Sequence, residues 1–336
     1  MPSKGWSEPE TGPEVFEAMA KGMERSAPLV SSVFRRCAGD VLALAVVGET
    51  PSWDAPHRLL AGVRWLVLNG EVEDFEEADD SWRVFRAILQ DHDAWLARFV
   101  RERTVQTNEV QRCWALLPLF LVVARRVDRP LALIELGTSA GLNLLWDRYA
   151  YSYRAGAWGG PRADLRLFGK ERGTVPAGLL RTSVEVQARV GIDVAPVDAT
   201  TDDGVRLLKT FVRDAGYHTR VERAAEVLRD DPPELVRGDY VELLPALLRD
   251  RSDDAITVVF QTHSTVYLSD SERVRLRAIV DEAGREGPLA WISTPTPEEH
   301  GQRLGDYPLE LAIWPGGERR IVARTNVRGE WLDWIA

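Results

Sequence analysis

Cysteine is scarce in this chain of 336 residues, which contains only Cys37 and Cys113. Two thiols cannot form a disulfide framework, and neither has the spacing of a metal-ligand motif. Both lie in apolar segments with helical periodicity, so we expect buried, unreactive thiols. The five histidines also lack the spacing of metal ligands, and we expect no metal site.

Long apolar runs and basic clusters are missing as well. No apolar run reaches the roughly 18–20 residues that span a bilayer, and the first residues lack the apolar core of a signal peptide. The net charge is −10 and is spread evenly over both halves. Nucleic-acid binding needs clustered lysine and arginine. We therefore expect a cytoplasmic protein that binds neither membrane nor nucleic acid; the oligomeric state is not predicted.

The spacing of apolar residues changes near Pro130. Residues 13–126 repeat apolar residues every three to four positions, as in amphipathic helices. Pro130 cannot continue a helix and disfavours helical angles at the preceding residue. We therefore place a domain boundary there, between an all-α domain at residues 1–128 and a second domain at 129–336.

Two positions bound the predicted helices of the first domain. Gly70 is suited to end one helix, and Ser81 is suited to cap the next. The residues between them, 71–80, include seven acids. We expect a solvated loop there, with a docking site for a basic partner as the alternative.

After Pro130, short β-rich segments alternate with helical ones, which predicts a parallel sheet covered on both faces. The five segments are LALIEL, RVGIDV, ELVRGD, AITVVF and LAWIST. Gly316 and Gly317 predict an antiparallel terminal hairpin. An insertion at about 150–180 is expected to form a β-ribbon and loop near the site. The predicted fold class is a Rossmann-like α/β sheet with an antiparallel C-terminal hairpin, preceded by the helical domain.

The stretch LALIELGTSAGLNLLWDRY, residues 131–149, ends a predicted strand in an acid and a glycine-containing loop before helical spacing resumes. Ligands of open α/β sheets lie at the carboxyl ends of the strands, and glycine permits a tight turn and close approach of a ligand. A dinucleotide site would need glycines where the chain has Ser139 and Leu142, and no G-K-S/T sequence of a P-loop is present. A plain strand-to-helix turn is the structural alternative.

The pattern E-x-G-x-S-x-G resembles motif I of class I S-adenosylmethionine (SAM) methyltransferases, with serine in place of the middle glycine. Asp193 and Asp239 end the next two predicted strands in the order that this resemblance requires. It implies that Asp193 accepts hydrogen bonds from the ribose hydroxyls and that Asp239 or its neighbour Tyr240 meets the adenine amino group. Each aspartate also fits an ordinary turn. The implied SAM contacts are Glu135, Gly137, Thr138, Ser139, Gly141, Asn143, Asp193, Asp239 and Tyr240.

Six motifs in order resemble the DUF2332 family, whose members are mostly actinobacterial and have no assigned function. They are QTNEVQRCWALLPLF, ELGTSAGLNLLWDRYAYSY, VGIDVAPVD, VRGDYVELLP, VVFQTHSTVYL and RGEWLDW. The resemblance implies a helical region followed by a methyltransferase-like domain. Family members usually carry histidine at Gln261, and an acid-x-His pair at Asn326 and Arg328.

The end of the fourth predicted strand carries the candidate catalytic residues Gln261, His263 and Tyr267. His263 is the preferred general base because imidazole titrates near neutral pH; a histidine that merely closes a loop is the alternative. Because the protein is acidic, we expect neighbouring carboxylates to raise the pKa of His263.

Two further groups have open interpretations. Asn108 and Glu109 either lie near the same cleft or, for Asn108, cap the following helix. The aromatic residues at the start of the insertion either line a pocket for a cation or flat substrate, or pack the ribbon; they are Tyr149, Tyr151, Tyr153 and Trp158.

These observations favour a SAM-dependent methyltransferase acting on a small molecule. Intramolecular alkylation of SAM, which releases methylthioadenosine, is an alternative that needs only a different alignment in the site. A third possibility is a protein that binds SAM or S-adenosylhomocysteine (SAH) without turnover, because fold alone does not determine function.

Overall fold

The computed structural model describes residues 11–49, 51–295 and 305–336. The chain forms two compact units. Of the described residues, the helical unit contains those up to Thr107 together with Asp202–Arg213, and the sheet unit contains those from Asn108 to Thr201 and those after Arg213. The division therefore lies one helix earlier in the sequence than the expected boundary after residue 128. A later segment, Asp202–Arg213, also belongs to the helical unit.

The helical unit contains the helices expected from the apolar spacing before Pro130, and also α7, which was not expected there. They are α1 (Gly12–Met23), α2 (Pro28–Cys37), α3 (Val41–Val47), α4 (Ala55–Leu68), α5 (Ser81–Glu102) and α7 (Asp202–Thr210). Gly70 follows the end of α4 with a φ of 72°. The cap of α5 is Asp80 rather than Ser81, because the Asp80 carboxylate accepts a hydrogen bond from the Arg83 amide at 3.0 Å.

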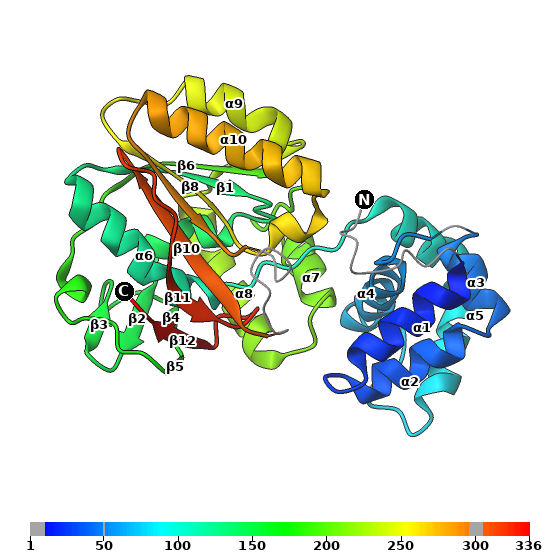
Figure 1. Ribbon diagram of the computed structural model, residues 1–336. Coiled ribbons are helices and arrows are strands. Elements are labelled where there is room, and N and C mark those ends of the chain that lie inside the picture. Colours follow the sequence, from blue (N-terminus) through cyan, green and yellow to red (C-terminus); the bar gives the residue numbers. More distant parts are fainter. Residues whose placement is uncertain (1–10, 50, 296–304) are drawn as a thin grey trace. The chain divides into compact units, whose positions relative to one another are not determined.

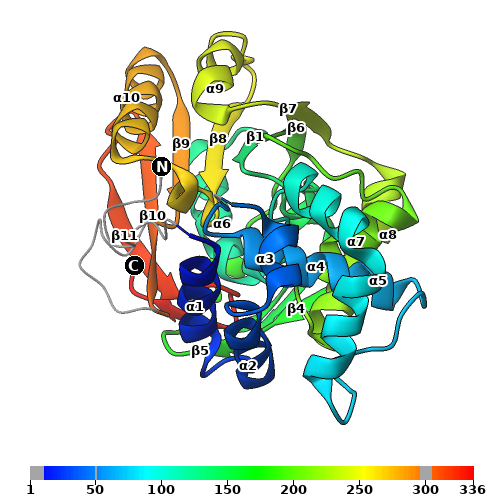
Figure 2. The same ribbon diagram turned by 90° about the vertical axis from the view of Figure 1, so that its right-hand side faces the viewer.

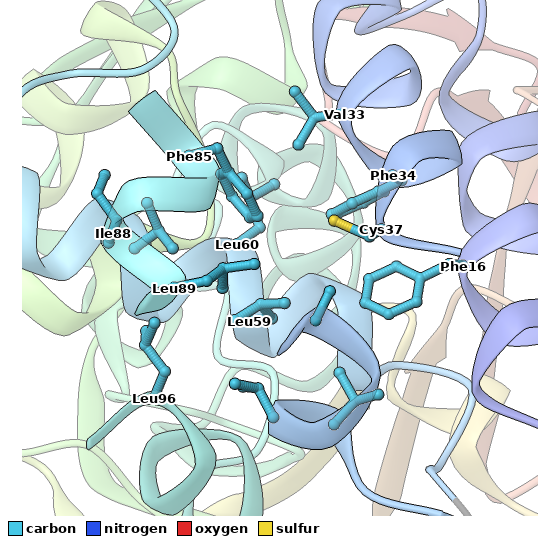
Figure 3. Packing of buried hydrophobic residues seen from close by; sticks show 14 of the residues in the cluster. Phe16, Val33, Phe34, Cys37, Leu59, Leu60, Phe85, Ile88, Leu89 and Leu96 are labelled. Carbon is cyan, nitrogen blue, oxygen red and sulfur yellow. The ribbon is translucent and has the colours of Figure 1, made fainter. Parts of the chain in front are cut away.

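A continuous apolar core joins helices α1 to α5 of this unit (Figure 3). Phe16, Phe34 and Phe85 are fully buried in it, together with the free thiol of Cys37. Burial raises the pKa of this thiol, as it does for the buried Cys113 of the sheet unit. The expectation that both cysteines are buried is confirmed.

Helix α7 belongs to the helical unit although it lies between two strands in the sequence. Leu208 of α7 is fully buried, and the Arg206 guanidinium lies over the Trp65 ring of α4, 5.4 Å from its centroid. Arg213, just after α7, bridges to Asp74 at 2.7 Å and also pairs with other acids of the loop before α5. The acidic loop before α5 is therefore paired with an arginine of the same unit.

The sheet unit contains a nine-stranded sheet with the order β5-β12-β11-β10-β9-β8-β1-β6-β7. The strands are β1 (Leu131–Leu136), β5 (Lys170–Glu171), β6 (Val186–Asp193), β7 (Glu234–Arg237), β8 (Ile256–Gln261), β9 (Leu289–Ser293), β10 (Tyr307–Trp314), β11 (Arg320–Thr325) and β12 (Trp331–Trp334). Strands β7, β6, β1, β8 and β9 are parallel, as expected, and β10 and β11 form the antiparallel hairpin. Figure 2 shows the parallel strands side by side.

Helices cover both faces of this sheet (Figure 1). On one face, α9 (Tyr240–Arg249) and α10 (Asp270–Glu286) bury a cluster that includes Ile134 and Val259. On the other, Phe120 of α6 (Arg112–Val127) meets Phe260 of β8 edge to face, with ring centroids 5.2 Å apart. Helix α8 (Ala215–Asp230) completes the unit.

Helix α6 joins the sheet unit because almost its whole surface is apolar and buried. Its end is marked by Asp128, which adopts a left-handed conformation with a φ of 48°, and Pro130 then begins the approach to β1. Pro130 thus ends the helix as expected, but the unit boundary lies at the start of this helix.

The insertion forms the expected β-ribbon. Strands β2 (Ala150–Tyr153), β3 (Gly156–Trp158) and β4 (Arg166–Phe168) build a small sheet with the order β3-β2-β4, followed by the short helix η2 (Leu179–Arg181). The three tyrosines are buried, and their hydroxyls donate to backbone carbonyls of Leu142, Trp146 and Trp114. These rings pack the ribbon and do not line an aromatic pocket.

None of the helices in the described residues combines the length and apolar character needed to cross a membrane.

Candidate functional site

The order of the strands creates a switch point between β1 and β8. From β1 the sheet grows to β6 and β7 on one side and to β8 and β9 on the other. The loops that leave β1 and β8 therefore diverge, and ligands of open α/β sheets bind at such a point. The loop Gly137–Gly141 and residues Gln261–Ser264 lie there.

The loop after β1 is a tight turn with three left-handed residues. Gly137, Ser139 and Gly141 have φ values of 70°, 56° and 77°. A Cβ at Gly137 would overlap the side chain of Ser264, and one at Gly141 would lie 2.8 Å from Cγ of Pro233. Glycine is therefore needed for the turn and for close protein packing.

The helix expected after this loop is a short 3₁₀ helix, η1 (Leu142–Arg148), with Gly141 at its N-cap. Asn108 accepts a hydrogen bond from the Leu142 amide at 3.0 Å through its side-chain oxygen. It therefore caps η1, whereas the N-cap of α6 is Gln111. Glu109 is buried and pairs with Arg220 at 3.0 Å, which fixes the same segment.

Asp193, at the end of β6, ties two loops together. One carboxylate oxygen accepts from the Ser139 amide at 2.9 Å, and the other accepts from the Ala195 amide at 2.9 Å. The next residue, Val194, is 58% exposed, so an uncovered apolar side chain lies beside this acid.

Glu135 is a buried acid at the end of β1, with 1% of its surface exposed. Its carboxyl oxygens accept from the Thr138 hydroxyl at 2.6 Å and from the Asn143 amide at 3.3 Å. Loss of hydration raises the pKa of Glu135 to about 8, against the opposing effect of these hydrogen bonds and of the Arg112 charge. Glu135, Thr138 and Asn143 thus form one buried network beneath the loop.

Asp239 and Tyr240 follow β7. The exposed Asp239 caps α9 by accepting from the Val241 amide at 2.7 Å. Burial raises the pKa of Tyr240, and its hydroxyl lies close to that of Ser264, which opposes the increase. Among the described residues, neither hydroxyl has a hydrogen-bond partner by distance and angle. Ser264 is also the side chain that packs against Gly137. Two buried hydroxyls without a partner among the described residues therefore lie together at the switch point.

The candidate catalytic residues have different surroundings. Gln261 is buried. Its side-chain nitrogen donates to the Thr294 carbonyl at 3.0 Å, and its side-chain oxygen accepts from the Ser264 backbone amide at 3.2 Å. This pairing fixes the loop after β8. Tyr267, in the 3₁₀ helix η3 (Ser264–Tyr267), is 53% exposed.

His263 adopts a left-handed conformation with a φ of 62°, and its amide donates to the Thr294 hydroxyl at 2.6 Å. Its ring meets the Tyr307 ring edge to face, with centroids 4.6 Å apart. Burial lowers the pKa of His263 well below its usual value, and the Arg112 charge lowers it further. The expected increase from neighbouring carboxylates is wrong, because the charged group that acts on the ring is an arginine. His263 is therefore neutral at pH 7.

Arg112, the first residue of α6, was missed by the sequence analysis. Its Nε donates to the Val327 carbonyl at 2.8 Å, and Nη1 lies 3.3 Å from both oxygen atoms of Thr262. A lone arginine at the start of an otherwise apolar helix, in VQRCWALLPLF, was the available indication.

The structure thus brings the loop after β1, Asp193, Tyr240 and Ser264 together through direct contacts. In the part of the chain that the structure describes, no three or more His, Cys, Asp or Glu residues are grouped so that they could hold a metal ion.

The comparison with known families finds one that spans nearly the whole chain. The family described as "Uncharacterized protein conserved in bacteria (DUF2332)" matches residues 13–334. No curated protein matches the sequence.

Proposed function

The chain belongs to the DUF2332 family, and we propose that it is a SAM-dependent methyltransferase acting on a small molecule. The observation that carries the proposal is the pair of unsatisfied buried hydroxyls, Tyr240 and Ser264, beside the loop after β1. They lie at the switch point, where α/β sheets bind ligands.

The residues at this edge fit the chemistry of SAM. A carboxylate such as that of Asp193 accepts hydrogen bonds of the kind that ribose hydroxyls donate, and the exposed Val194 offers an apolar surface to an adenine ring. Asp239 is exposed and keeps a carboxylate oxygen beyond the one that caps α9. The Tyr240 and Ser264 hydroxyls can donate or accept toward the remaining polar groups.

SAM supplies a methyl group that is already activated by the sulfonium. In the transfer, a lone pair of the substrate's oxygen or nitrogen would bond to the methyl carbon, and the electron pair of the carbon–sulfur bond would stay on sulfur. The neutral His263 ring would accept the proton that the attacking oxygen or nitrogen loses. The loop after β1 and the packed Ser264 hold the site in one geometry, which lowers the cost of aligning the reactants.

The binding test is a thermal melt of the purified protein with SAM, SAH or NAD. A ligand that binds only the folded state stabilises it by about 2.7 kcal/mol at a hundredfold excess over Kd. A clear shift with SAM or SAH supports the proposal, whereas a shift with NAD alone refutes it.

A matched pair of variants locates the binding site. Asp193→Asn should weaken SAH binding roughly ten- to hundredfold, as expected for loss of a hydrogen bond to a charged group. The control Asp198→Asn changes an exposed turn aspartate on the same segment and should leave binding unchanged. Incubation with SAM alone then tests the chemistry, because methylthioadenosine without an acceptor would indicate intramolecular alkylation instead.

A further inference from the structure

Thr294, which directly follows β9, holds the loop after the neighbouring strand β8 at two points. Its hydroxyl oxygen accepts from the His263 amide at 2.6 Å, and its carbonyl accepts from the Gln261 side chain at 3.0 Å. The Gln261 side chain in turn accepts from the Ser264 amide at 3.2 Å. Thr294 is buried, with 3% of its surface exposed. The ends of two paired strands are thus joined on both sides of His263.

The backbone of His263 needs such support because it is left-handed, with a φ of 62°. A residue with a Cβ disfavours this conformation, which persists only where the surrounding structure fixes it. The Thr294 hydroxyl is the acceptor that the structure gives to the His263 amide. Removal of this hydroxyl would leave the amide without that acceptor and would favour a different backbone conformation.

The position of the His263 ring depends on this backbone. Among the described residues, no group hydrogen bonds to either ring nitrogen, and the ring meets Tyr307 edge to face with centroids 4.6 Å apart. The apolar side chains around it belong to Ala115 and Leu116 of α6 and to Leu309 of β10. The main chain and apolar packing therefore place the imidazole, with no polar contact to orient it.

We infer that Thr294 is a positioning residue, whose hydroxyl fixes the left-handed backbone of His263 and thereby the place of the imidazole that accepts the substrate proton. The catalytic part of this inference rests on the proposed function, whereas the placement of the ring does not. A reacting group displaced by about 1 Å can cost roughly a hundredfold in rate. Loss of the hydroxyl should therefore affect kcat more than the affinity for SAM.

Three variants separate the hydroxyl from its surroundings. Thr294→Val replaces the hydroxyl by a methyl group and keeps the carbonyl that bonds Gln261. Thr294→Ser retains the hydroxyl and is the conservative rescue. Thr257→Val is the matched control, because Thr257 is buried in β8 and its hydroxyl has no hydrogen-bond partner among the described residues.

The first measurement follows the histidine rings by NMR of histidine-labelled protein without any ligand. The His263 signal is the one that His263→Asn removes, since asparagine tolerates the left-handed conformation. In Thr294→Val the signal should lose the ring-current shift that Tyr307 causes. Thr294→Ser and Thr257→Val should keep the parent signal. An unchanged His263 signal in Thr294→Val would overturn the inference.

The same spectra give the pKa of His263. Burial holds this pKa well below 6.5, and Arg112, the charged group that faces the ring, lowers it further. Tyr307 is the other titratable group against the ring. Because a displaced ring becomes better hydrated, the pKa in Thr294→Val should rise toward 6.5. A rise of the same size in Thr257→Val would contradict the role of the Thr294 hydroxyl.

Steady-state kinetics is the second measurement. Thr294→Val should lower kcat roughly ten- to hundredfold, leave the KM for SAM near that of the parent, and move the decrease of kcat/KM in acid to higher pH. Thr294→Ser should restore all three values. An equal loss of kcat in both Thr294 variants would overturn the inference, because the hydroxyl would then have no part in the effect.

If Thr294→Val does not fold, hydrogen exchange of the parent protein decides. The His263 amide should exchange slowly, and exchange as fast as that of an exposed amide would overturn the inference. The two proposals fail separately. A displaced ring in a protein that does not bind SAM supports the placement by Thr294 and contradicts the proposed function. SAM turnover that Thr294→Val leaves unchanged contradicts only this inference.

Discussion

Glu135 shows how a single buried acid makes stability depend on pH. Its folded-state pKa is raised to about 8 from an ordinary value of 4.5, mainly by loss of hydration. The folded protein therefore binds this proton more tightly than the unfolded chain does. The contribution of Glu135 is most favourable below pH 4.5, declines as the pH rises toward 8, and is constant above that.

We predict that Glu135→Gln removes this dependence. The free energy of unfolding of the variant, relative to the parent, should increase between pH 5 and pH 8 by at most about 1.4 kcal/mol per pH unit. Urea unfolding at several pH values measures it. Glu282→Gln, at an exposed position of α10, is the control and should parallel the parent. A constant difference for Glu135→Gln would mean that this carboxyl is ionised in the fold.

His263 gives the second prediction at this scale. Because its pKa is well below 6.5, the ring is already neutral at pH 6.5. We expect kcat/KM to stay level down to about pH 6.5 and to fall only in more acidic solution, as the ring becomes protonated. His263→Asn should lower kcat by roughly 10²–10⁴ while SAH affinity stays near normal. A value of kcat/KM that already decreases as the pH is lowered from 7.5 would contradict the role of His263 as a base. An Asn variant with more than a tenth of the parent activity would contradict it as well.

Among the elements, the parallel strands were predictable because each is a short apolar run bounded by turn residues, as in LALIEL before Gly137. The partner of α7 was not predictable, because its apolar face meets α4 about 140 residues earlier in the sequence. The 3₁₀ form of η1 was also missed, because the spacing of apolar residues over so short a segment does not distinguish a 3₁₀ helix from an α-helix.

At the candidate site, the sequence identified the residues that form the loop after β1 and its supporting contacts, but it did not identify Ser264 and Arg112. Glu135, Gly137, Gly141 and Asp193 were chosen from one motif and its strand order, and they form a contiguous edge. Ser264 and Arg112 lie outside that motif. The importance of Ser264 follows from its buried hydroxyl, which has no hydrogen-bond partner among the described residues, and that of Arg112 follows from its bonds to Val327 and Thr262; only a folded chain displays either.

The loop after β1 leads to a prediction about its packing. Gly141→Ala should cost roughly 2–4 kcal/mol, because the added methyl group meets Pro233 and Leu235 while φ stays near 77°. Gly305→Ala is the matched control, since Gly305 also has a positive φ but no atom of the described residues lies within 4 Å of its added Cβ. Denaturant unfolding of both variants measures the difference. Equal costs would show that the packing around Gly141 yields easily.

For the whole molecule, the two units are not two consecutive stretches of the sequence. Residues Asp202–Arg213 lie between β6 and β7 in the sequence but belong to the helical unit. Phe211 is 2% exposed and packs edge to face on the His57 ring of α4, with centroids 5.9 Å apart. The stability of the helical unit therefore depends on residues from the second half of the chain.

We predict that Phe211→Ala destabilises the helical unit selectively, by about 3–5 kcal/mol, as expected for removal of a buried ring. Native-state hydrogen exchange reads this out locally. Amides of α4 and α1 should lose protection, whereas those of β1 and β8 should keep the parent values. Phe168→Ala, which removes a ring that is 70% exposed, is the control and should change neither set. If the strands lose protection to the same extent as the helices, the two units unfold as one, and the assignment of residues 202–213 to a separate helical unit has no energetic meaning.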